Sequence, residues 1–482
     1  MESLGTRVPF ALSTVGVLGY TFHLMATSFF GWGDASTLIL GFGSCTSAYY
    51  SAFAATNWAS FLLGLVLCVF VVNASSFRLC AIGAFLLSVG GWAALWAASA
   101  DSGTYSVAYF AGVCTGVSNG VFFLLWQNAF ALMDEKQAQS SIVVGSGLAG
   151  VPILVDLLVG SWVLSLVLIC VSLVGSLVSL LMLGGRYPRA RSWASYPLRE
   201  SKRAIASACK ALWKAACCVA ALGFVRGLLP SLVATYSNAV AGWQISLLLS
   251  VGRVLSSAFL IVLMMRLFAK QRSLNLESVY LVAFPIMATG FLLLPFAGVE
   301  YQTVFMFITY VVFALVSMLM MIDCLRESRR CGLHPMLVYG AYAGFVYACT
   351  QAGSVLGDYS NTLGWQGLPW VFVLALLAVY VMALAFFVTR MRRPGRAEEL
   401  PASADLDAKC EALSSRYGLS PREKEVFVLL AKGRDLPRIS QELFISDNTT
   451  RSHMRNIYKK LDVHSKQEII DMLESANIDD GR

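Results

Sequence analysis

Long apolar stretches occupy most of the first 390 residues of this chain, and they restrict its fold more than any other feature. A helix needs about 20 mostly apolar residues to cross a bilayer, and twelve stretches have roughly that length. Because backbone polar groups find no water in hydrocarbon, stretches of this kind become helices there. Only 13% of the residues are charged, against about 25% in soluble domains. The sequence therefore predicts an all-α membrane bundle.

The predicted spans follow one another through short connections. Segment 36–54, between the first two, is rich in Gly and Ser and only moderately apolar, and a loop packed on the outer face would fit it. The twelve predicted spans are residues 8–30, 55–73, 78–98, 105–131, 141–160, 162–184, 211–236, 242–267, 277–297, 301–323, 335–356 and 368–389.

Charges in the connections alternate along the chain. Every second connection, starting with the first, lacks Lys and Arg, and four of these six hold an acidic residue, namely Asp34, Asp101, Glu300 and Asp358. Because cytoplasmic loops carry the excess of Lys and Arg, this pattern predicts a multi-pass inner-membrane protein with both termini in the cytoplasm. It also argues against a crossing by 36–54, which would invert every later connection. The basic connections hold Arg78; Lys136; Arg186, Arg189, Arg191, Arg199, Lys202 and Arg203; Arg266, Lys270 and Arg272; and Arg326, Arg329 and Arg330.

The longest basic connection, residues 185–210, divides the spans into two sets of six, about 8–184 and 211–389. This arrangement resembles the major facilitator superfamily, whose two six-helix halves surround a central cavity. The resemblance implies a 6+6 bundle over residues 1–390. The transporters' usual signature in the second-to-third connection is Gly-rich with an Asp and several basic residues. That connection here reads VVNASSFRLC, which favours a sensor over a transporter.

Ionisable side chains inside spans are expensive, so each is a candidate site residue. A polar cluster could line the cavity with an arginine pairing an anionic ligand, or Asp156 could form an internal ion pair with Arg226 or Arg253 that holds helices together; both interpretations stay open. His23 fits a packing role. The run 126–128 could contact an aromatic or polar ligand or serve packing. The candidate ligand-binding residues are Trp126, Gln127, Asn128, Asp156, Arg226 and Arg253.

After the last span the composition changes. Residues 391–412 are rich in Pro, Ala and charge and have no apolar period, so we expect a flexible linker. Residues 413–482 then form a separate domain. Ser420, Pro421 and Glu423 form a capping box at a first helix, and a second short helix follows the turn at Gly433.

A third helix starts at Ser446 or Asn448, and a fourth covers about 465–474. Arg451, Arg455 and Lys459 share one side of the third helix at i, i+4 and i+8, while its other side is apolar. Two short helices with a tight turn between them, the second with a basic front, match a helix-turn-helix. Such a front fits the major groove, where Arg and Lys donate to guanine.

The segment LSPREKEV, the Gly433 turn and LFISDNTTRSHMRNIYKKL resemble the LuxR-type helix-turn-helix, which also ends NarL-like response regulators. The resemblance implies a four-helix domain whose fourth helix, here 466–474, supplies a homodimer contact. Three positions depart from the family pattern: Ser440 stands for a common Ala, Thr450 for a core Val and Asp462 for a Gly. By position, the base contacts fall on Arg451, Ser452 and Arg455, and the phosphate contacts on Thr449, Lys459 and Lys460.

Together these features predict a membrane-tethered transcription regulator. Its expected partners are double-stranded DNA, the lipid bilayer and an unknown small-molecule ligand. A transporter with a DNA-binding appendage is the alternative. The sequence holds no nucleophile–base grouping, metal-ligand set or phosphate loop, so neither an enzyme nor a cofactor or metal is expected.

Overall fold

The chain folds into two compact units, Met1–Met391 and Arg392–Arg482, in a computed structural model. Each unit is considered by itself. The residues that the structure describes contain helices and no strands. They are 10–31, 45–71, 73–100, 105–184, 198–234, nine residues within 251–262 (251, 252, 254–256, 258, 259, 261 and 262), 276–294, 296, 298–362, 368–390, 402–431, 436–443, 446–463, 468, 469 and 472.

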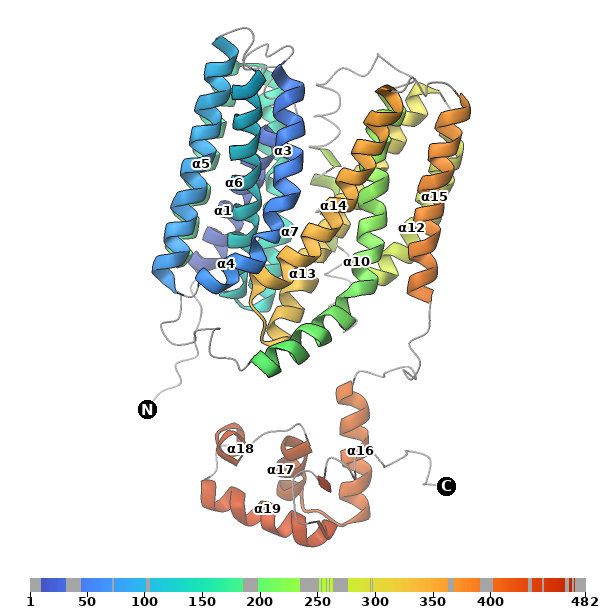
Figure 1. The fold of residues 1–482 in the computed structure, drawn as a ribbon. Helices are drawn as coiled ribbons and strands as arrows, with labels where there is room; N and C mark the ends of the chain where they lie inside the picture. Colours follow the sequence, from blue (N-terminus) through green and yellow to red (C-terminus); the bar gives the residue numbers. More distant parts are fainter. Residues whose placement is uncertain are drawn as a thin grey trace. The chain divides into compact units, whose positions relative to one another are not determined.

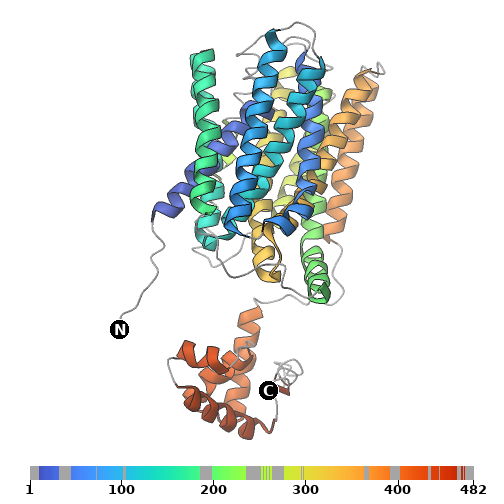
Figure 2. The same cartoon turned by 60° about the vertical axis from the view of Figure 1, so that its left-hand side comes forward.

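The first unit is a bundle of helices that run roughly along one direction (Figure 1), as a view turned by 60° also shows (Figure 2). Its helices are α1 (Phe10–Gly31), α3 (Cys45–Leu62), α4 (Gly64–Phe70), α5 (Ala74–Ala100), α6 (Tyr105–Ala131), α7 (Glu135–Leu148), α8 (Gly150–Val159), α9 (Trp162–Gly184), α10 (Leu198–Ala234), α12 (Leu276–Leu293), α13 (Val299–Cys331), α14 (Pro335–Thr362) and α15 (Leu368–Arg390).

Helices occupy the predicted spans wherever the structure describes them. Within these residues, six stretches are long and apolar enough to cross a membrane, and the bent pair α3–α4 brings the number to seven. Two further apolar helices are shorter, Val279–Leu293 and Phe372–Phe387. In the predicted span 242–267 only scattered residues from 251 onward are described, and they are helical.

The second span differs from the sequence-based expectation. Residues 45–54 are the first turns of α3, not a loop, although they add no extra crossing. The reason is close packing against α6. A Cβ at Gly116 would lie 2.7 Å from the Phe53 carbonyl oxygen, and one at Gly112 would meet the Tyr49 carbonyl. Small residues allow such close helix contacts. Because small residues are also common in loops, the sequence of this helix face resembled that of a loop.

The helices α10 and α13 extend well beyond the predicted spans into basic connections. α10 begins at Leu198, so residues 198–210 are helical although the sequence placed them in the connecting loop. α13 runs to Cys331 and carries Arg326, Arg329 and Arg330 past the expected end at 323. Charged residues lower the hydropathy of these turns without interrupting a helix. The end of the bundle that holds these three arginines and Lys136 is called the basic end below.

The second unit contains α16 (Ala402–Arg416), α17 (Pro421–Ala431), α18 (Leu436–Leu443) and α19 (Asp447–Leu461). Residues 402–412 form most of α16, whereas the sequence placed them in a flexible linker. Cys410 and Leu413 are buried in the core of this unit, and Tyr417 packs against it. These residues recur at i, i+3 and i+7, the period of a helix face, but polar neighbours conceal the pattern.

The capping box at the start of α17 is confirmed and has a third member. The Ser420 N–H donates to Glu423 Oε2 at 2.9 Å, and the Glu423 N–H donates to Ser420 Oγ at 3.4 Å. Lys460 Nζ, from α19, donates to the same carboxylate at 2.7 Å and to the Gly418 carbonyl at 2.9 Å. These hydrogen bonds, chiefly the one from Lys460, lower the pKa of Glu423 to about 2.

Two departures from the family pattern pair with each other. Ser440 Oγ on α18 lies 2.9 Å from Thr450 Oγ1 on α19, and both residues are buried. Each hydroxyl also reaches a carbonyl of its own helix region, at Leu436 or Ser446. A buried hydroxyl is costly only when it lacks a partner, so the added Thr450 hydroxyl is accommodated by the added Ser440 hydroxyl.

This pairing predicts non-additive stability. In fragment 392–482, the losses in unfolding free energy for Ser440→Ala and Thr450→Val should together exceed that of the double variant by about 0.5–1.5 kcal/mol. The measurement is a double-mutant cycle of urea unfolding curves. Thr450→Val combined with Ser452→Ala, whose hydroxyl is exposed, should be additive. An additive Ser440–Thr450 pair would contradict the interaction.

The Glu423 contacts predict a pH dependence. Because the pKa falls from about 4.5 to about 2 on folding, the stabilisation is complete above pH 4.5 and is lost as the pH falls toward 2. Glu423→Gln should therefore lower the unfolding free energy of the fragment by about 1–3 kcal/mol near neutral pH, and the difference should shrink below pH 4.5. Glu425→Gln is the control, since Glu425 forms only an exposed pair with Arg422.

Candidate functional site: a basic helix face and a central cavity

The exposed face of α19 carries the predicted DNA contacts. Ile457 and Leu461 are buried, and Met454 and Tyr458 pack against the same core. Because these apolar residues fix the orientation of the helix, the residues between them face outward. All six predicted contacts are exposed, namely Thr449, Arg451, Ser452, Arg455, Lys459 and Lys460.

The N-terminus of α19 is held by Ser446. Its side chain accepts a hydrogen bond from the Thr449 N–H at 3.1 Å, and its hydroxyl lies 2.8 Å from Thr449 Oγ1. The alternative start at Asn448 is thereby excluded. At the other end Asp462, one of the three departures from the family pattern, adopts the left-handed conformation with φ 53°.

Lys460 has a different environment from the other predicted contacts. Its ammonium binds Glu423 and the Gly418 carbonyl of its own domain. A cation held this way joins α19 to α17, and because Lys460 is also exposed, its phosphate contact stays a prediction. Nothing in the spacing of the sequence distinguishes it from Lys459, because the partner lies 37 residues earlier.

The fourth helix is described only at residues 468, 469 and 472, all helical. Ile469 is buried in the core of the domain, and Met472 packs against it. These two residues therefore stabilise their own domain. The remainder of the predicted dimer segment 466–474 lies outside the described residues, as do Gly433 and the turn at 444–445.

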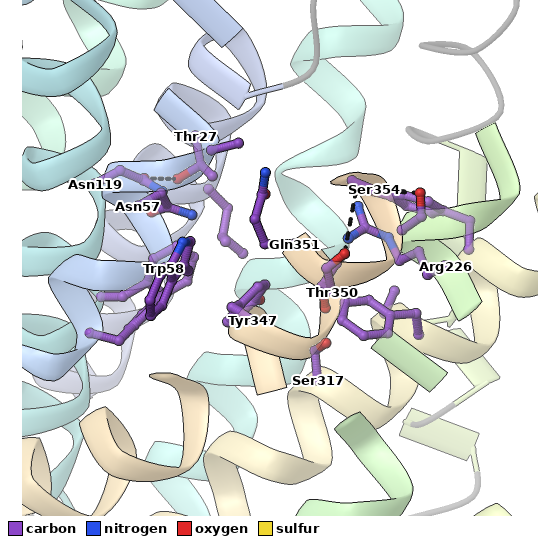
Figure 3. A pocket seen from close by; sticks show the side chains of 18 of the residues that line it. Thr27, Asn57, Trp58, Asn119, Arg226, Ser317, Tyr347, Thr350, Gln351 and Ser354 are labelled. Atoms are coloured by element: carbon purple, nitrogen blue, oxygen red, sulfur yellow. Dashed lines mark hydrogen bonds between the residues drawn. The ribbon is translucent and has the colours of Figure 1, made fainter. Parts of the chain in front are cut away.

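A cavity of about 620 Å³ lies between the two halves of the membrane bundle. This volume is in the range of small-molecule sites. Residues of α1, α3, α6 and α7 line one side, and residues of α10, α13 and α14 line the other (Figure 3). Its lining runs along α14 from Tyr339 to Asp358, which is about 28 Å of helix. The sequence places Asp358 in a connection, but it belongs to α14.

Among the predicted ligand-binding residues, Arg226 lines this cavity. Trp126 is buried and donates from its indole N–H to Ser176 Oγ at 3.1 Å, away from the cavity lining. Gln127 donates to the Met321 carbonyl, and Asn128 is buried. The aromatic run therefore serves packing, as one of the two interpretations expects.

Asp156 is also absent from the cavity lining in the part of the chain that the structure describes. It is buried, and Ser165 Oγ lies 2.7 and 3.0 Å from its two carboxylate oxygens. The polar group beside it is thus a hydroxyl of α9 instead of Arg226. His23 is buried and packs edge-on against Phe123 at 4.4 Å between ring centroids. Arg253 lies outside the described residues.

Sequence reasoning missed a chain of polar side chains on the wall that α1, α3 and α6 form. Thr27 Oγ1 lies 2.8 Å from Asn119 Oδ1, and Asn119 Nδ2 lies 3.0 Å from Asn57 Oδ1 (Figure 3). The other wall holds Thr350, Gln351 and Ser354 from α14. Uncharged polar residues are common in spans, so their composition alone does not identify a site.

The two halves meet closely at the basic end. Arg329 Nη2 donates to the carbonyls of Phe130 and Met133, at 3.0 and 2.6 Å, where α6 ends. Arg326 pairs with Glu135 at 3.4 Å. Arg329 thus binds backbone carbonyls where α6 ends, Arg326 binds a carboxylate of α7, and both side chains connect α13 to the opposite half.

The contacts between the two halves continue from the basic end toward the cavity. Gln127 Nε2 donates to the Met321 carbonyl at 2.9 Å, and Tyr20 Oη lies 3.0 Å from Met321 Sδ. Gly64 and Gly340 bring α4 and α14 together, since a Cβ at Gly340 would lie 3.1 Å from Gly64 Cα. Tyr20 and Met321 also line the cavity. Part of the cavity wall is therefore formed by residues that join the two halves.

Solved structures with low sequence identity share the fold of the membrane unit. The Escherichia coli fucose:proton symporter FucP aligns over 80% of this chain and 99% of that protein, with a TM-score of 0.52 and 14% identity. A bacterial homologue of the iron transporter ferroportin in an outward-facing state aligns over 79% and 98%, with a TM-score of 0.54 and 14% identity. The membrane unit thus has the major facilitator fold.

The C-terminal unit matches regulatory proteins. The luxR family of bacterial regulatory proteins matches residues 418–473. Spore germination protein GerE of Bacillus subtilis is 37% identical over 72 residues, which cover 15% of this chain and 97% of GerE. The uncharacterized response regulatory protein YgeK of Escherichia coli is 45% identical over 65 residues. That match covers 13% of this chain and 44% of YgeK, so it spans less than half of that relative.

The described helix-turn-helix, with its capped α17 and its exposed basic face on α19, is the part that these relatives share. The chain is a multi-pass membrane protein that belongs, through this C-terminal domain, to the luxR family of bacterial regulatory proteins.

Proposed function

We propose that this protein is a membrane-tethered transcription regulator that binds promoter DNA in response to a small ligand in its membrane unit. The observation that carries the proposal is the outward basic face of α19 on a luxR-family domain. Arg451, Ser452 and Arg455 would contact base edges in the major groove, where Arg donates to guanine N7 and O6. Thr449 and Lys459 would contact phosphates, which position a protein on the duplex.

The charge pattern supports a location in the inner membrane with the DNA-binding domain in the cytoplasm. Lys and Arg gather at the basic end, where Arg326, Arg329 and Arg330 lie on the last turns of α13. Cytoplasmic segments carry this excess. A pair of domains, joined through segment 466–474, would bind two half-sites. Such a pair gives more phosphate contacts than one domain alone.

The cavity supports the sensing part of the proposal. A ligand changes an equilibrium only when it binds two arrangements with different affinity. Part of the cavity wall is formed by Tyr20 and Met321, which also join the two halves. A ligand that contacts either residue would therefore favour one arrangement of the halves over another.

Arg455→Ala tests the DNA contact. A DNA fragment selected from a random-sequence pool by the wild-type chain serves as the probe. The substitution should weaken binding by about 1–3 kcal/mol and relax the base preference at one position. Lys459→Ala should instead weaken all sequences alike and reduce the salt slope by about 1. Affinities are measured by fluorescence anisotropy at several salt concentrations.

Arg422→Ala is the matched control, because Arg422 is an exposed arginine of the same domain that lies on α17 and pairs with Glu425. Its DNA affinity should equal that of the wild type. Equal losses for Arg422→Ala and Arg455→Ala would mean that general charge, and not the face of α19, governs binding.

Arg329→Gln tests the coupling. It removes two hydrogen bonds between the halves, each worth about 1.5–3 kcal/mol when a charged donor is involved. The equilibrium between arrangements should then shift at least tenfold, and reporter transcription without added ligand should change severalfold. Arg330→Gln should match the wild type, since Arg330 pairs with Glu327 on its own helix. Identical transcription for both variants at equal membrane levels would refute the coupling.

A further inference from the structure

We infer that the cavity binds an organic carboxylate with a planar aromatic body. This inference rests on the proposed function, because it names the ligand class of the same site. Three features carry it: one half-buried cation among the lining residues that the structure describes, an aromatic surface that belongs to both halves, and a terminal amide across from the cation. Figure 3 shows Arg226 on one side and Asn57 on the other, with Tyr347 and Gln351 between them.

The charge of the wall selects an anion. Among the described lining residues, Arg226 and Asp358 are the two that are charged at neutral pH. Asp358 is exposed and lies eight residues beyond Thr350 on α14, which is about 12 Å farther along the helix. Arg226 is half-buried beside Thr350, since a Cβ at the neighbouring Gly227 would meet the Thr350 carbonyl. A ligand group at this depth therefore lies beside the Arg226 guanidinium, with Asp358 farther along α14.

The surroundings of Arg226 favour a carboxylate. Its Cζ lies 4.7 Å from the centroid of Phe313 and 5.4 Å from that of Tyr310. Rings on this side fix the plane of the guanidinium, and a planar fork matches a carboxylate in two parallel hydrogen bonds. Thr350 Oγ1 donates to the Val346 carbonyl at 3.0 Å, and Ser354 Oγ lies 3.3 Å from the Gly227 carbonyl. With these hydroxyl hydrogens directed to the backbone, the guanidinium is the group that meets the anion.

The aromatic surface favours a planar body. Phe61 of α3 and Tyr347 of α14 stack with an interplanar angle of 10° and a centroid distance of 5.1 Å. Trp58 lies beside Phe61 in the lining. Offset stacking of a third ring on such a surface is favourable beyond the burial of its apolar area. Phe61 itself is fully buried, so the aromatic faces open to the cavity belong to the half-buried Trp58 of α3 and Tyr347 of α14. A ring that contacts these two residues touches both halves.

The amide chain accommodates a polar substituent at the far end of the ligand. Thr27 Oγ1 lies near both the His23 carbonyl and Asn119 Oδ1, at 2.9 and 2.8 Å, but its single hydrogen serves one of them. If it serves Asn119, Asn57 presents its NH₂ group to the cavity. If it serves His23, both amides turn over and Asn57 presents its carbonyl. The chain can thus donate to or accept from the ligand.

The test compares naphthoate with naphthamide, which has the same shape without the charge. Binding to the purified full-length chain in lipid nanodiscs is measured by isothermal titration calorimetry, without DNA. Naphthoate should bind at least tenfold more tightly. Decalin carboxylate, which keeps the charge but lacks the aromatic face, should bind at least fivefold more weakly than naphthoate. Equal affinities in either comparison overturn the inference with the wild-type protein alone.

Variants then locate the two ends of the ligand. Arg226→Gln should abolish the preference for naphthoate over naphthamide, and Arg330→Gln, a substitution outside the cavity, should retain it. A naphthoate carrying a hydroxyl on its far ring should bind more tightly than naphthoate, and Asn57→Ala should remove that gain. A retained acid preference in Arg226→Gln would overturn the assignment of Arg226.

The binding experiment and the transcription experiment test the ligand class and the regulatory proposal separately. If naphthoate fails to bind while reporter transcription still responds to Arg329→Gln, the ligand class is wrong and the regulatory proposal stands. If naphthoate binds with the expected preference but reporter transcription responds neither to it nor to Arg329→Gln, the ligand class stands and the regulatory proposal fails.

Discussion

The membrane unit depends on the hydrogen bonds that backbone carbonyls at the end of α6 receive from the opposite half. The last turn of every helix leaves carbonyls without an intrahelical partner. At the end of α6, Arg329 donates from the opposite half to the Phe130 carbonyl, which also accepts from the Met133 N–H, and to the Met133 carbonyl just beyond the helix. The two halves are therefore joined through hydrogen bonds to the backbone and not only through surface charge. The cavity exists because this contact closes one end of the bundle while the aromatic and polar walls diverge from it.

Sequence reasoning predicted the membrane unit well where hydropathy is the governing quantity. It failed where packing governs instead. α3 begins at Cys45, ten residues before the predicted span, because its small residues face the glycines of α6. The site was harder still. Arg226 was identified because a charge in a span is rare, whereas Asn57 and Asn119 carry no such signal. Their role depends on three helices meeting, which no local pattern encodes.

The C-terminal domain was predicted more completely because its contacts are local or follow the spacing of a helix. The capping box and the two faces of α19 were both visible in the sequence, and the structure confirms them. The contact between Lys460 and Glu423 was not visible in the sequence, since Glu423 lies on another helix. α16 was missed because its buried face consists of widely spaced apolar residues among charged ones.

The contact between Ser440 and Thr450 has a consequence for how this domain can change over generations. An ancestor with Ala and Val at these positions would have no hydroxyl there, and the present chain has two that satisfy each other. Either single step leaves one buried hydroxyl without its cross-helix partner, at a loss of about 1 kcal/mol. A domain with a few kcal/mol of stability to spare can pass through that intermediate. The two positions should accordingly change together during evolution. Introducing only one of the two residues into a relative would bury a hydroxyl without the second hydroxyl that contacts it here.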